Sequence, residues 1–451
     1  MVSLGRERIP NRWRQQQRAW YVYDWANSAF STTVVTLFFG PYLTVLAKEA
    51  AGPDGTVALA GLQIHAAALW PFLVSISVLT QILALPLVGS LADHTGKKRE
   101  FLAALAFAGA TATASMYWLQ GSRYLLACVL FLIANFCFGA SVVVYNAFLP
   151  YIAHPWERDA VSSNGWALGY LGGALLLGLN LLLHWRAEAF AWEEEFVVRV
   201  SLCSAGLWWA AFSIVPVARL HNPVPTANRF GGEPVWRAGW SQLSATLKRL
   251  PSYRQTLLFL LAFFFYNDAI QAVITLAAQF GQEELQLDVR TLALCVLLAQ
   301  LVAFPGALAF KVVARWIGAK STVMVTLFIW TGIVAYVYLG VRSAAEFYGL
   351  SAAVGMVMGA SQALSRSLFS LLIPRGEEAR YFSLYEITDK GTSWVAPFIF
   401  GLALQWTGNF RLAVLSLLFF FAAGLALISR VNVREGAVAA GNPPPSAPTV
   451  G

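Results

Sequence analysis

The chain is poor in charged residues and in residues that commonly bind metals. Only 12% of its 451 residues are charged, compared with roughly a quarter in soluble domains, and it has 5 histidines and 4 cysteines. The histidines are scattered, and the sequence contains neither His-Glu-x-x-His nor Gly-x-x-x-x-Gly-Lys-[Ser/Thr]. Because the common zinc-peptidase and ATP-binding motifs are absent, we expect no enzymatic activity, no catalytic residue, no metal and no cofactor.

The cysteines show no pairing pattern. All of them fall inside apolar segments, with no Cys-x-x-Cys and no paired spacing in a loop: Cys128, Cys137, Cys203 and Cys295. Such residues are typical of packing positions and not of a disulfide or metal framework.

Apolar residues dominate instead. They make up 58% of the chain, and the mean hydropathy of +0.60 is typical of an integral membrane protein. A transmembrane helix needs about 20 apolar residues. The chain has twelve candidate segments, at about 19–47, 66–92, 101–119, 124–150, 164–184, 200–218, 255–279, 291–314, 321–341, 347–373, 384–406 and 410–429.

The basic residues follow the loops between these segments. If the N-terminus is cytoplasmic, 22 of the 31 Lys and Arg residues fall at the cytoplasmic ends and only 7 at the opposite ends. Cytoplasmic loops of membrane proteins carry such an excess. We therefore expect both termini in the cytoplasm, and we attribute the net charge of +8 to membrane topology and not to nucleic-acid binding.

The segment 255–279 carries an amide and a carboxylate near its middle. Asn267 and Asp268 stand side by side within FFFYNDAIQAVI. A charge at that depth costs at least about 2.5 kcal/mol and normally faces a cavity or the interior of a bundle. Asp268 therefore has one of two roles. It belongs to a pathway for substrate or protons, or it is a structural residue that holds neighbouring helices together.

The first segment carries a polar stripe. Asp24 and Asn27 in YVYDWANSAFSTTVV share a helical face with Ser28 and Ser31. This stripe lines a cavity or forms a polar seam between helices.

The loop GSLADHTGKKRE, residues 89–100, resembles the loop between helices 2 and 3 of the major facilitator superfamily. The resemblance implies a gating role, and the residues that carry the spacing are Gly89, Asp93, Gly96, Lys97 and Lys98. Glycines permit close approach and a tight turn, while a carboxylate there can meet a helix N-terminus or an arginine.

Two later segments carry further ionisable residues. Arg366 lies inside the tenth segment with Gln362 four residues before it, on the same face. A buried Arg needs an anion, which Asp24, Asp268 or a substrate carboxylate or phosphate could supply. In LYEITDKGTSW, Glu386 and Lys390 are spaced to neutralise each other.

Matching positions indicate a duplicated chain. Pro150 and Pro374, like Gly96 and Gly318, stand about 220 residues apart. We predict a first six-helix bundle over 1–218, a cytoplasmic linker with an amphipathic segment over 219–253, a second bundle over 254–434 and a disordered tail over 435–451. The amphipathic segment lies on the inner leaflet or packs on the bundles.

Six motifs occur in a characteristic order. They are YDWANSAF, NAFLPYIA, GYLGG, YND, QALSRSLFS and YEITDKGTSW. Together they resemble the autophagy-related vacuole effluxer family of the major facilitator superfamily. The resemblance implies an all-α membrane protein of twelve transmembrane helices in two pseudo-symmetric bundles, alternating access and, for fungal members, release of amino acids from the vacuole.

These observations predict a secondary transporter of small solutes such as amino acids or similar zwitterions, coupled to protons. Substrate-binding candidates are Asn27, Asn267, Gln362 and Arg366, and proton-coupling candidates are Asp24, Asp268, Glu386 and Lys390. Alternatives are a lipid, amphiphile or drug exporter and a non-transporting membrane sensor. We expect a monomer in a bacterial plasma membrane, with small solutes, protons and lipids as partners and no nucleic acid.

Overall fold

The computed structural model describes residues 11–59, 61–223, 235–390, 395–407 and 409–443. Helices dominate the first half of the chain because most of its segments are long and apolar, so that in lipid their backbone groups must pair within the segment. The elements of this half are α1 (Asn11–Ala29), the π-helix η1 (Phe30–Phe38), α2 (Phe39–Ala50), β1 (Thr56–Leu59), β2 (Leu62–His65), η2 (Ala66–Ala68), α3 (Leu69–Thr95), α4 (Lys98–Ala114), η3 (Ser115–Trp118), α5 (Tyr124–Asn146), α6 (Leu149–Ile152), α7 (Arg158–Arg186), η4 (Glu188–Phe190) and α8 (Glu194–Arg219).

The second half follows the same plan after a helical linker. Its elements are α9 (Val235–Arg249), η5 (Leu250–Ser252), α10 (Arg254–Glu283), α11 (Val289–Ile317), α12 (Ala319–Leu339), α13 (Ala344–Leu371), α14 (Glu378–Lys390), α15 (Val395–Thr407), α16 (Phe410–Val414), α17 (Ser416–Arg430) and α18 (Val433–Ala439).

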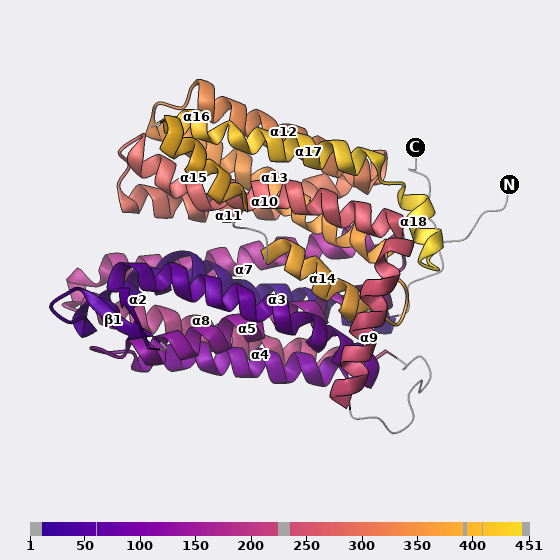
Figure 1. Cartoon of the computed structure of the whole chain (residues 1–451), viewed down its shortest axis with the longest axis horizontal. Coiled ribbons are helices and arrows are strands. Elements are labelled where there is room, and N and C mark those ends of the chain that lie inside the picture. Colours follow the sequence, from indigo (N-terminus) through magenta and orange to yellow (C-terminus); the bar gives the residue numbers. More distant parts are fainter. Residues whose placement is uncertain (1–10, 60, 224–234, 391–394, 408, 444–451) are drawn as a thin grey trace.

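The long helices form two groups that run side by side (Figure 1). We call α1–α8 the first bundle and α10–α17 the second bundle. α9 and α18 lie at one end of the molecule, which we call the linker end, and the strands β1 and β2 lie at the opposite end, the hairpin end. The two bundles therefore face each other along their length, as the duplicated sequence pattern predicts.

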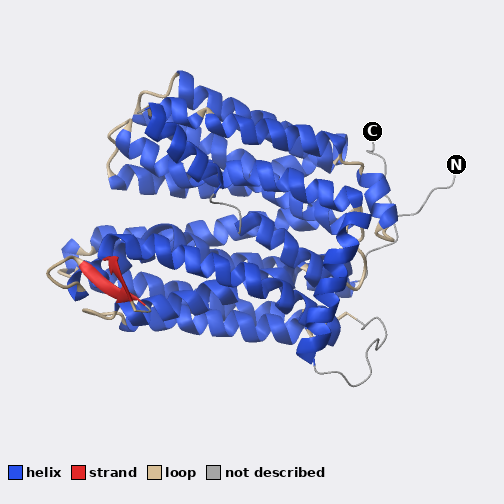
Figure 2. Cartoon of the chain, in the orientation of Figure 1, coloured by secondary structure: helices blue, strands red, loops and turns tan. Residues whose placement is uncertain are grey.

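Among the described residues, strand structure is confined to a short hairpin, which the sequence analysis did not predict (Figure 2). β1 pairs with β2 in antiparallel register, with Thr56 opposite His65 and Val57 opposite Ile64. Val57 is buried at 3% exposure and anchors the hairpin to the bundle. The rest of the described chain is helical or in loops and turns.

Eleven of the described helices are long and apolar enough to cross a membrane. The expected segment at 384–406 corresponds to parts of α14 and α15, and residues 391–394 between them lie outside the described residues. Large apolar side chains cover the outer surface, including Leu83, Leu339 and Phe419 at 65%, 70% and 63% exposure. Such a surface is unfavourable in water and is expected in contact with lipid.

Small residues bring the helices close together within each bundle. A Cβ atom added to Gly355 of α13 would overlap the carbonyl oxygen of Ala299 on α11, and one on Gly206 of α8 would overlap the backbone of Ala114 on α4. Helices in membranes pack through such small residues because lipid supplies no hydrophobic drive for their association.

The segment that follows the second bundle differs from the predicted disordered tail. α18 begins at Val433 and extends into the predicted tail, and the amide of Asn442 donates hydrogen bonds to the carbonyls of Leu371 and Ile373 at 3.0 and 2.8 Å. These carbonyls at the end of α13 lack helical partners, so Asn442 satisfies them. The Gly- and Pro-rich composition of this segment is typical of disorder and gave no indication of this contact.

The linker contains the helix that its amphipathic pattern indicates. α9 packs across α3, and the hydroxyl of Thr246 accepts a hydrogen bond from Nη1 of Arg380 at 3.2 Å, while Trp240 is 52% exposed. Residues 224–234 of the predicted linker lie outside the described residues. α9 thus contacts both bundles, α3 by packing and α14 through Arg380.

Candidate functional site

Four charged side chains from the two bundles meet at the linker end. Nζ of Lys98 lies 2.8 Å from Oδ1 of Asp93 and 3.2 Å from Oε2 of Glu378, and all three side chains are almost completely buried. Nε of Arg380 lies 3.8 Å from Oδ2 of Asp93. Arg380 also pairs with Glu377, the residue before α14, at 3.3 Å. These pairings offset part of the cost of burying the charges. We call Asp93, Lys98, Glu378 and Arg380 the linker-end network.

Asp93 also fixes the start of α14. Its two carboxylate oxygens accept the backbone N–H groups of Ala379 and Arg380 at 3.2 and 2.9 Å. The first N–H groups of a helix have no partner within it, and a carboxylate is favoured there by the helix dipole. Asp93 therefore joins the end of α3 in the first bundle to the beginning of α14 in the second.

The two glycines of the predicted gating loop have distinct structural roles. A Cβ atom on Gly89 would overlap the carbonyl oxygen of Ala379, so glycine lets α3 and α14 touch. Gly96 ends α3 with a φ of 66°, a left-handed conformation that glycine adopts without strain. Lys97 is exposed, whereas Lys98, the next residue in the chain, is buried.

A second group of polar side chains surrounds Arg366. Its Nη1 and Nη2 each lie 3.2 Å from Oδ2 of Asp24, and its Nε and Nη2 donate hydrogen bonds to Oγ and the carbonyl oxygen of Ser162, both at 2.9 Å. Nη1 also donates to Oδ1 of Asn146 at 3.3 Å. Asp24, Asn146 and Ser162 belong to the first bundle and Arg366 to the second, so the arginine connects the two bundles.

Aromatic rings enclose the same guanidinium. Its central carbon lies 4.6 Å from the ring centroid of Trp20, 5.3 Å from that of Trp166 and 5.6 Å from that of Tyr145. The faces of these rings carry negative partial charge and attract a cation. Arg366 is thus held by charge, hydrogen bonds and rings together, and it is only 2% exposed.

Asn146 extends this group towards α14. Its Nδ2 donates to Oε1 of Glu386 at 3.1 Å, and Oε2 of Glu386 lies 3.3 Å from Nζ of Lys390. The ammonium of Lys390 lies 4.5 Å from the ring centroid of Phe138 on α5. We call the six polar side chains that are connected in this way the central network: Asp24, Asn146, Ser162, Arg366, Glu386 and Lys390.

The structure selects among the partners that the sequence left open for Arg366. The arginine pairs with Asp24, and Glu386 pairs with Lys390 as their spacing indicates. Asn27 is buried on α1. The hydroxyl of Ser28 donates to the carbonyl of Asp24 in its own helix at 2.7 Å, so this part of the polar stripe is satisfied locally.

Two other candidates form a separate cluster within the second bundle. Nε2 of Gln362 donates to Oδ1 of Asn267 at 2.8 Å, and Nδ2 of Asn267 donates to Oδ1 of Asp389 at 2.7 Å. Because Gln362 lies one helical turn before Arg366 on α13, this cluster is adjacent to the central network.

Asp268 stands apart from both groups. Its Oδ2 accepts the backbone N–H of Ala396, in the first turn of α15, at 2.8 Å, and the residue is 1% exposed. This contact is that of a helix-capping carboxylate. The other carboxylate oxygen of Asp268, Oδ1, is buried and meets no hydrogen-bond partner among the described residues, so both interpretations of Asp268 stay predictions.

Several residues within or beside the two networks were not predicted as site residues from the sequence. Asn146 and Tyr151 lie in the motif NAFLPYIA, and the hydroxyl of Tyr151 donates a short hydrogen bond to Glu378. Ser162, Glu378 and Arg380 carried no signal of their own, because their partners within the two networks lie more than 200 residues away along the chain. Within the described residues, no group of three or more His, Cys, Asp or Glu side chains could hold a metal ion.

Two bundles of membrane-length helices, joined by buried ion pairs, form the architecture of the major facilitator fold. Solved structures share this fold: the major facilitator transporter FucP in its outward conformation has a TM-score of 0.67 at 14% identity, covering 93% of this chain and 98% of that one. A bacterial homologue of the iron transporter ferroportin in an outward-facing state has a TM-score of 0.65, also at 14% identity, with coverage of 93% and 98%.

The chain belongs to the vacuole effluxer Atg22-like family, whose model matches residues 12–441. It is 28% identical to the uncharacterized MFS-type transporter YxiO of Bacillus subtilis, over 93% of this chain and 95% of the relative. It is 26% identical to autophagy-related protein 22 of Eremothecium gossypii, over 93% and 91%. The predicted family, fold and transporter class are confirmed, and the protein is an integral membrane transporter and not an enzyme.

Proposed function

We propose that the protein is a secondary transporter of small solutes, namely amino acids or similar zwitterions, that works by alternating access and is coupled to protons. The observation that carries this proposal is the central network, in which the pair Arg366 and Asp24 joins the two bundles inside the protein. Buried ionisable groups within membrane helices are costly and generally serve a transport pathway.

A zwitterion has the charges needed to open this network. Its carboxylate can replace Asp24 as the partner of Arg366, with the bidentate geometry that a guanidinium favours. Its ammonium can take the place of Lys390 beside Glu386. Since each substrate charge substitutes for a protein charge of the same sign, the site remains neutral while the contacts between the bundles are exchanged.

Alternating access requires that the linker-end network also opens. Asp93 and Lys98 of the first bundle meet Glu378 and Arg380 of the second, so this end is closed in the present conformation. Separating the bundles here breaks buried ion pairs and uncaps α14. Substrate binding must therefore favour the opened state by enough free energy to offset these losses.

Glu386 is the group best placed to carry the proton. It contacts Asn146 of the first bundle and Lys390 of its own helix, and it is 3% exposed. Protonation would remove its attraction for Lys390 and leave the central network with a net positive charge. That charge favours the substrate carboxylate, which links proton binding to substrate binding.

The test uses the purified full-length protein in liposomes, with a substrate first found by a thermal-shift screen of amino acids, peptides and amphiphiles. A ligand at 100 times its Kd stabilises the folded state by about 2.7 kcal/mol. We expect Glu386→Gln to reduce accumulation driven by a pH gradient at least ~10-fold, because the amide cannot carry the proton. Exchange of substrate at equal concentrations should persist.

Full pH-driven accumulation by Glu386→Gln would place the proton carrier elsewhere. Loss of both activities would show that the substrate ammonium depends on the charge of Glu386, and the assignment of Glu386 as the proton carrier would then lack support. Amphiphiles as the sole hits of the screen would support the second candidate function, export of lipids, other amphiphiles or drugs, which the apolar cavity of the second bundle favours.

We further propose that the linker end faces the cytoplasm of a bacterium, with the protein as a monomer in the plasma membrane. The basic residues concentrate in the loops at this end, and the relative YxiO is bacterial. A cysteine in place of Asp54, in the loop before β1, should react with an impermeant reagent in intact cells, whereas one in place of Lys248 on α9 should not. The opposite labelling pattern would reverse the orientation.

A further inference from the structure

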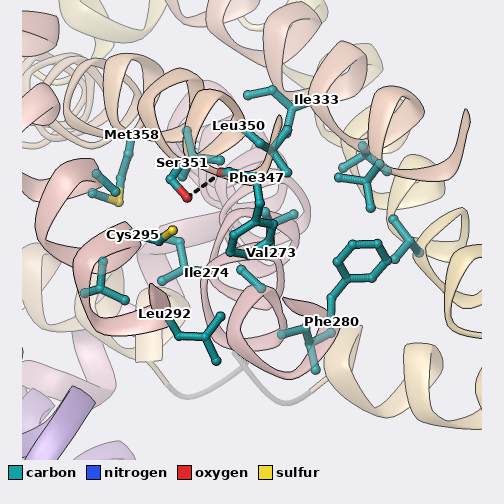
Figure 3. Close-up of a pocket in the computed structure, with 18 of the residues that line it drawn as sticks. Val273, Ile274, Phe280, Leu292, Cys295, Ile333, Phe347, Leu350, Ser351 and Met358 are labelled. Carbon is teal, nitrogen blue, oxygen red and sulfur yellow. Dashed lines mark hydrogen bonds between the residues drawn. The ribbon is translucent and has the colours of Figure 1, made fainter. Parts of the chain in front are cut away.

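The second bundle contains a cavity in its half nearest the hairpin end. Its volume is about 170 Å³, and side chains from α10, α11, α12, α13, α15, α16 and α17 line it (Figure 3). Val273 and Phe280 of α10, Leu292 of α11 and Phe347 of α13 surround it with apolar surface. None of its lining residues belongs to the central network, so it is a separate site.

The polar atoms around the cavity are almost all engaged elsewhere. The hydroxyl of Ser351 donates to the carbonyl of Phe347 at 2.9 Å, one turn earlier in α13 (Figure 3). The hydroxyl of Thr36 donates to the carbonyl of Ser31 at 2.8 Å. Gln300 differs, since its buried Oε1 meets no hydrogen-bond donor among the residues that the structure describes. The cavity is thus half-open and mostly apolar, with one acceptor that lacks a donor.

We propose that this cavity binds a small, mostly apolar molecule of about one or two rings that donates one hydrogen bond to Gln300. An engineered apolar cavity of about 150 Å³ remains dry and holds benzene, so the size suits such a molecule. A buried acceptor without a donor is unfavourable, and a ligand N–H or O–H directed at Gln300 would satisfy it. A purely apolar ligand would fill the space and leave the acceptor unpaired.

Thr36 gives this site a connection to the conformational cycle. It is the lining residue that comes from the first bundle, on η1, so the wall of the cavity is complete when the two bundles have the present arrangement. A ligand that contacts this complete wall binds the present arrangement better than one in which the bundles have moved. Occupancy therefore stabilises this state and acts on transport from a distance.

The experiment compares two bicyclic probes of the same size on the purified full-length protein. Indole has an N–H donor, and benzofuran has an oxygen in its place. Isothermal titration should show saturable binding of one molecule per chain, with indole bound at least ~5-fold more tightly than benzofuran because its donor reaches Gln300. Gln300→Met keeps the volume and removes the acceptor, so the two probes should then bind within ~2-fold of each other.

A second variant tests the location. Ala277→Leu places a larger side chain in the wall and should weaken both probes at least ~10-fold, while Ala104→Leu, on the exposed face of α4, should leave both unchanged. The proposal fails if neither probe saturates, if Ala277→Leu binds both like the unaltered protein, or if the preference for indole survives in Gln300→Met. The Gln300→Met variant tests the proposal even if Ala277→Leu does not fold.

Discussion

The linker-end network and the central network are built from the same charges but are held differently. Each places two cations and two anions between the bundles. At the linker end, however, Asp93 is tied to two backbone N–H groups at the start of α14. In the central network, Asp24 and Glu386 contact side chains of Arg366, Asn146 and Lys390.

This difference indicates different tasks. A carboxylate on a helix N-terminus has one favoured position, because the backbone that it contacts moves only with the whole helix. Side-chain partners can be exchanged for the charges of a ligand without moving a helix. The linker-end network is therefore suited to holding a conformation, and the central network is suited to recognising a solute.

The largest effect is expected from Arg366→Ala. The change leaves Asp24 buried without its cation, and breaking such a pair costs about 3–5 kcal/mol. We expect lower thermal stability and loss of both substrate binding and transport. The double variant Asp24→Ala, Arg366→Ala should recover stability but not substrate binding, which thermal unfolding and ligand titration would measure. Normal substrate affinity in the double variant would make the arginine purely structural.

A smaller effect is expected from Asp93→Asn. The amide keeps the size but loses the attraction to Lys98 and weakens the hydrogen bonds to α14, which as charge-assisted bonds contribute about 1.5–3 kcal/mol. Transport in liposomes should slow about 10-fold, while substrate affinity stays within ~2-fold. Lys97→Ala is the matched control, since that exposed neighbour lies outside the buried network. Equal transport rates for the two variants would contradict a gating role for Asp93.

The smallest effect is expected from Asp268→Asn. An amide oxygen can still accept the N–H of Ala396, so transport should remain within ~2-fold and stability should fall by at most about 1 kcal/mol. Asp268→Leu should destabilise more, by about 1–3 kcal/mol, since it leaves that N–H unpaired. If Asp268→Asn instead loses pH-driven transport as Glu386→Gln is expected to, then Asp268 is the proton carrier that its position in the sequence suggested.

Much of the site was predictable as a set of residues but not as a set of pairs. Arg366 and Asp24 are conspicuous because a charge inside an apolar segment is rare. Their pairing was one of several alternatives, since helical periodicity gives the face of each helix and not its neighbour. Glu386 and Lys390 could be paired from the sequence because their spacing of four residues places them on one face of one helix.

The sequence alone determined the properties that depend on local composition. Long apolar segments within a membrane must form helices, because every backbone N–H and C=O group there needs a hydrogen-bond partner inside the protein. The motif from Gly89 to Lys98 indicates a helix end, a turn and a carboxylate. Tertiary structure alone decided that Glu378 and Arg380 meet this motif, that Asn146 connects Arg366 to Glu386, and that Asp268 caps α15. Each of these contacts joins residues more than 100 positions apart, and only the packing of the helices brings them within the few ångströms over which a hydrogen bond or ion pair acts.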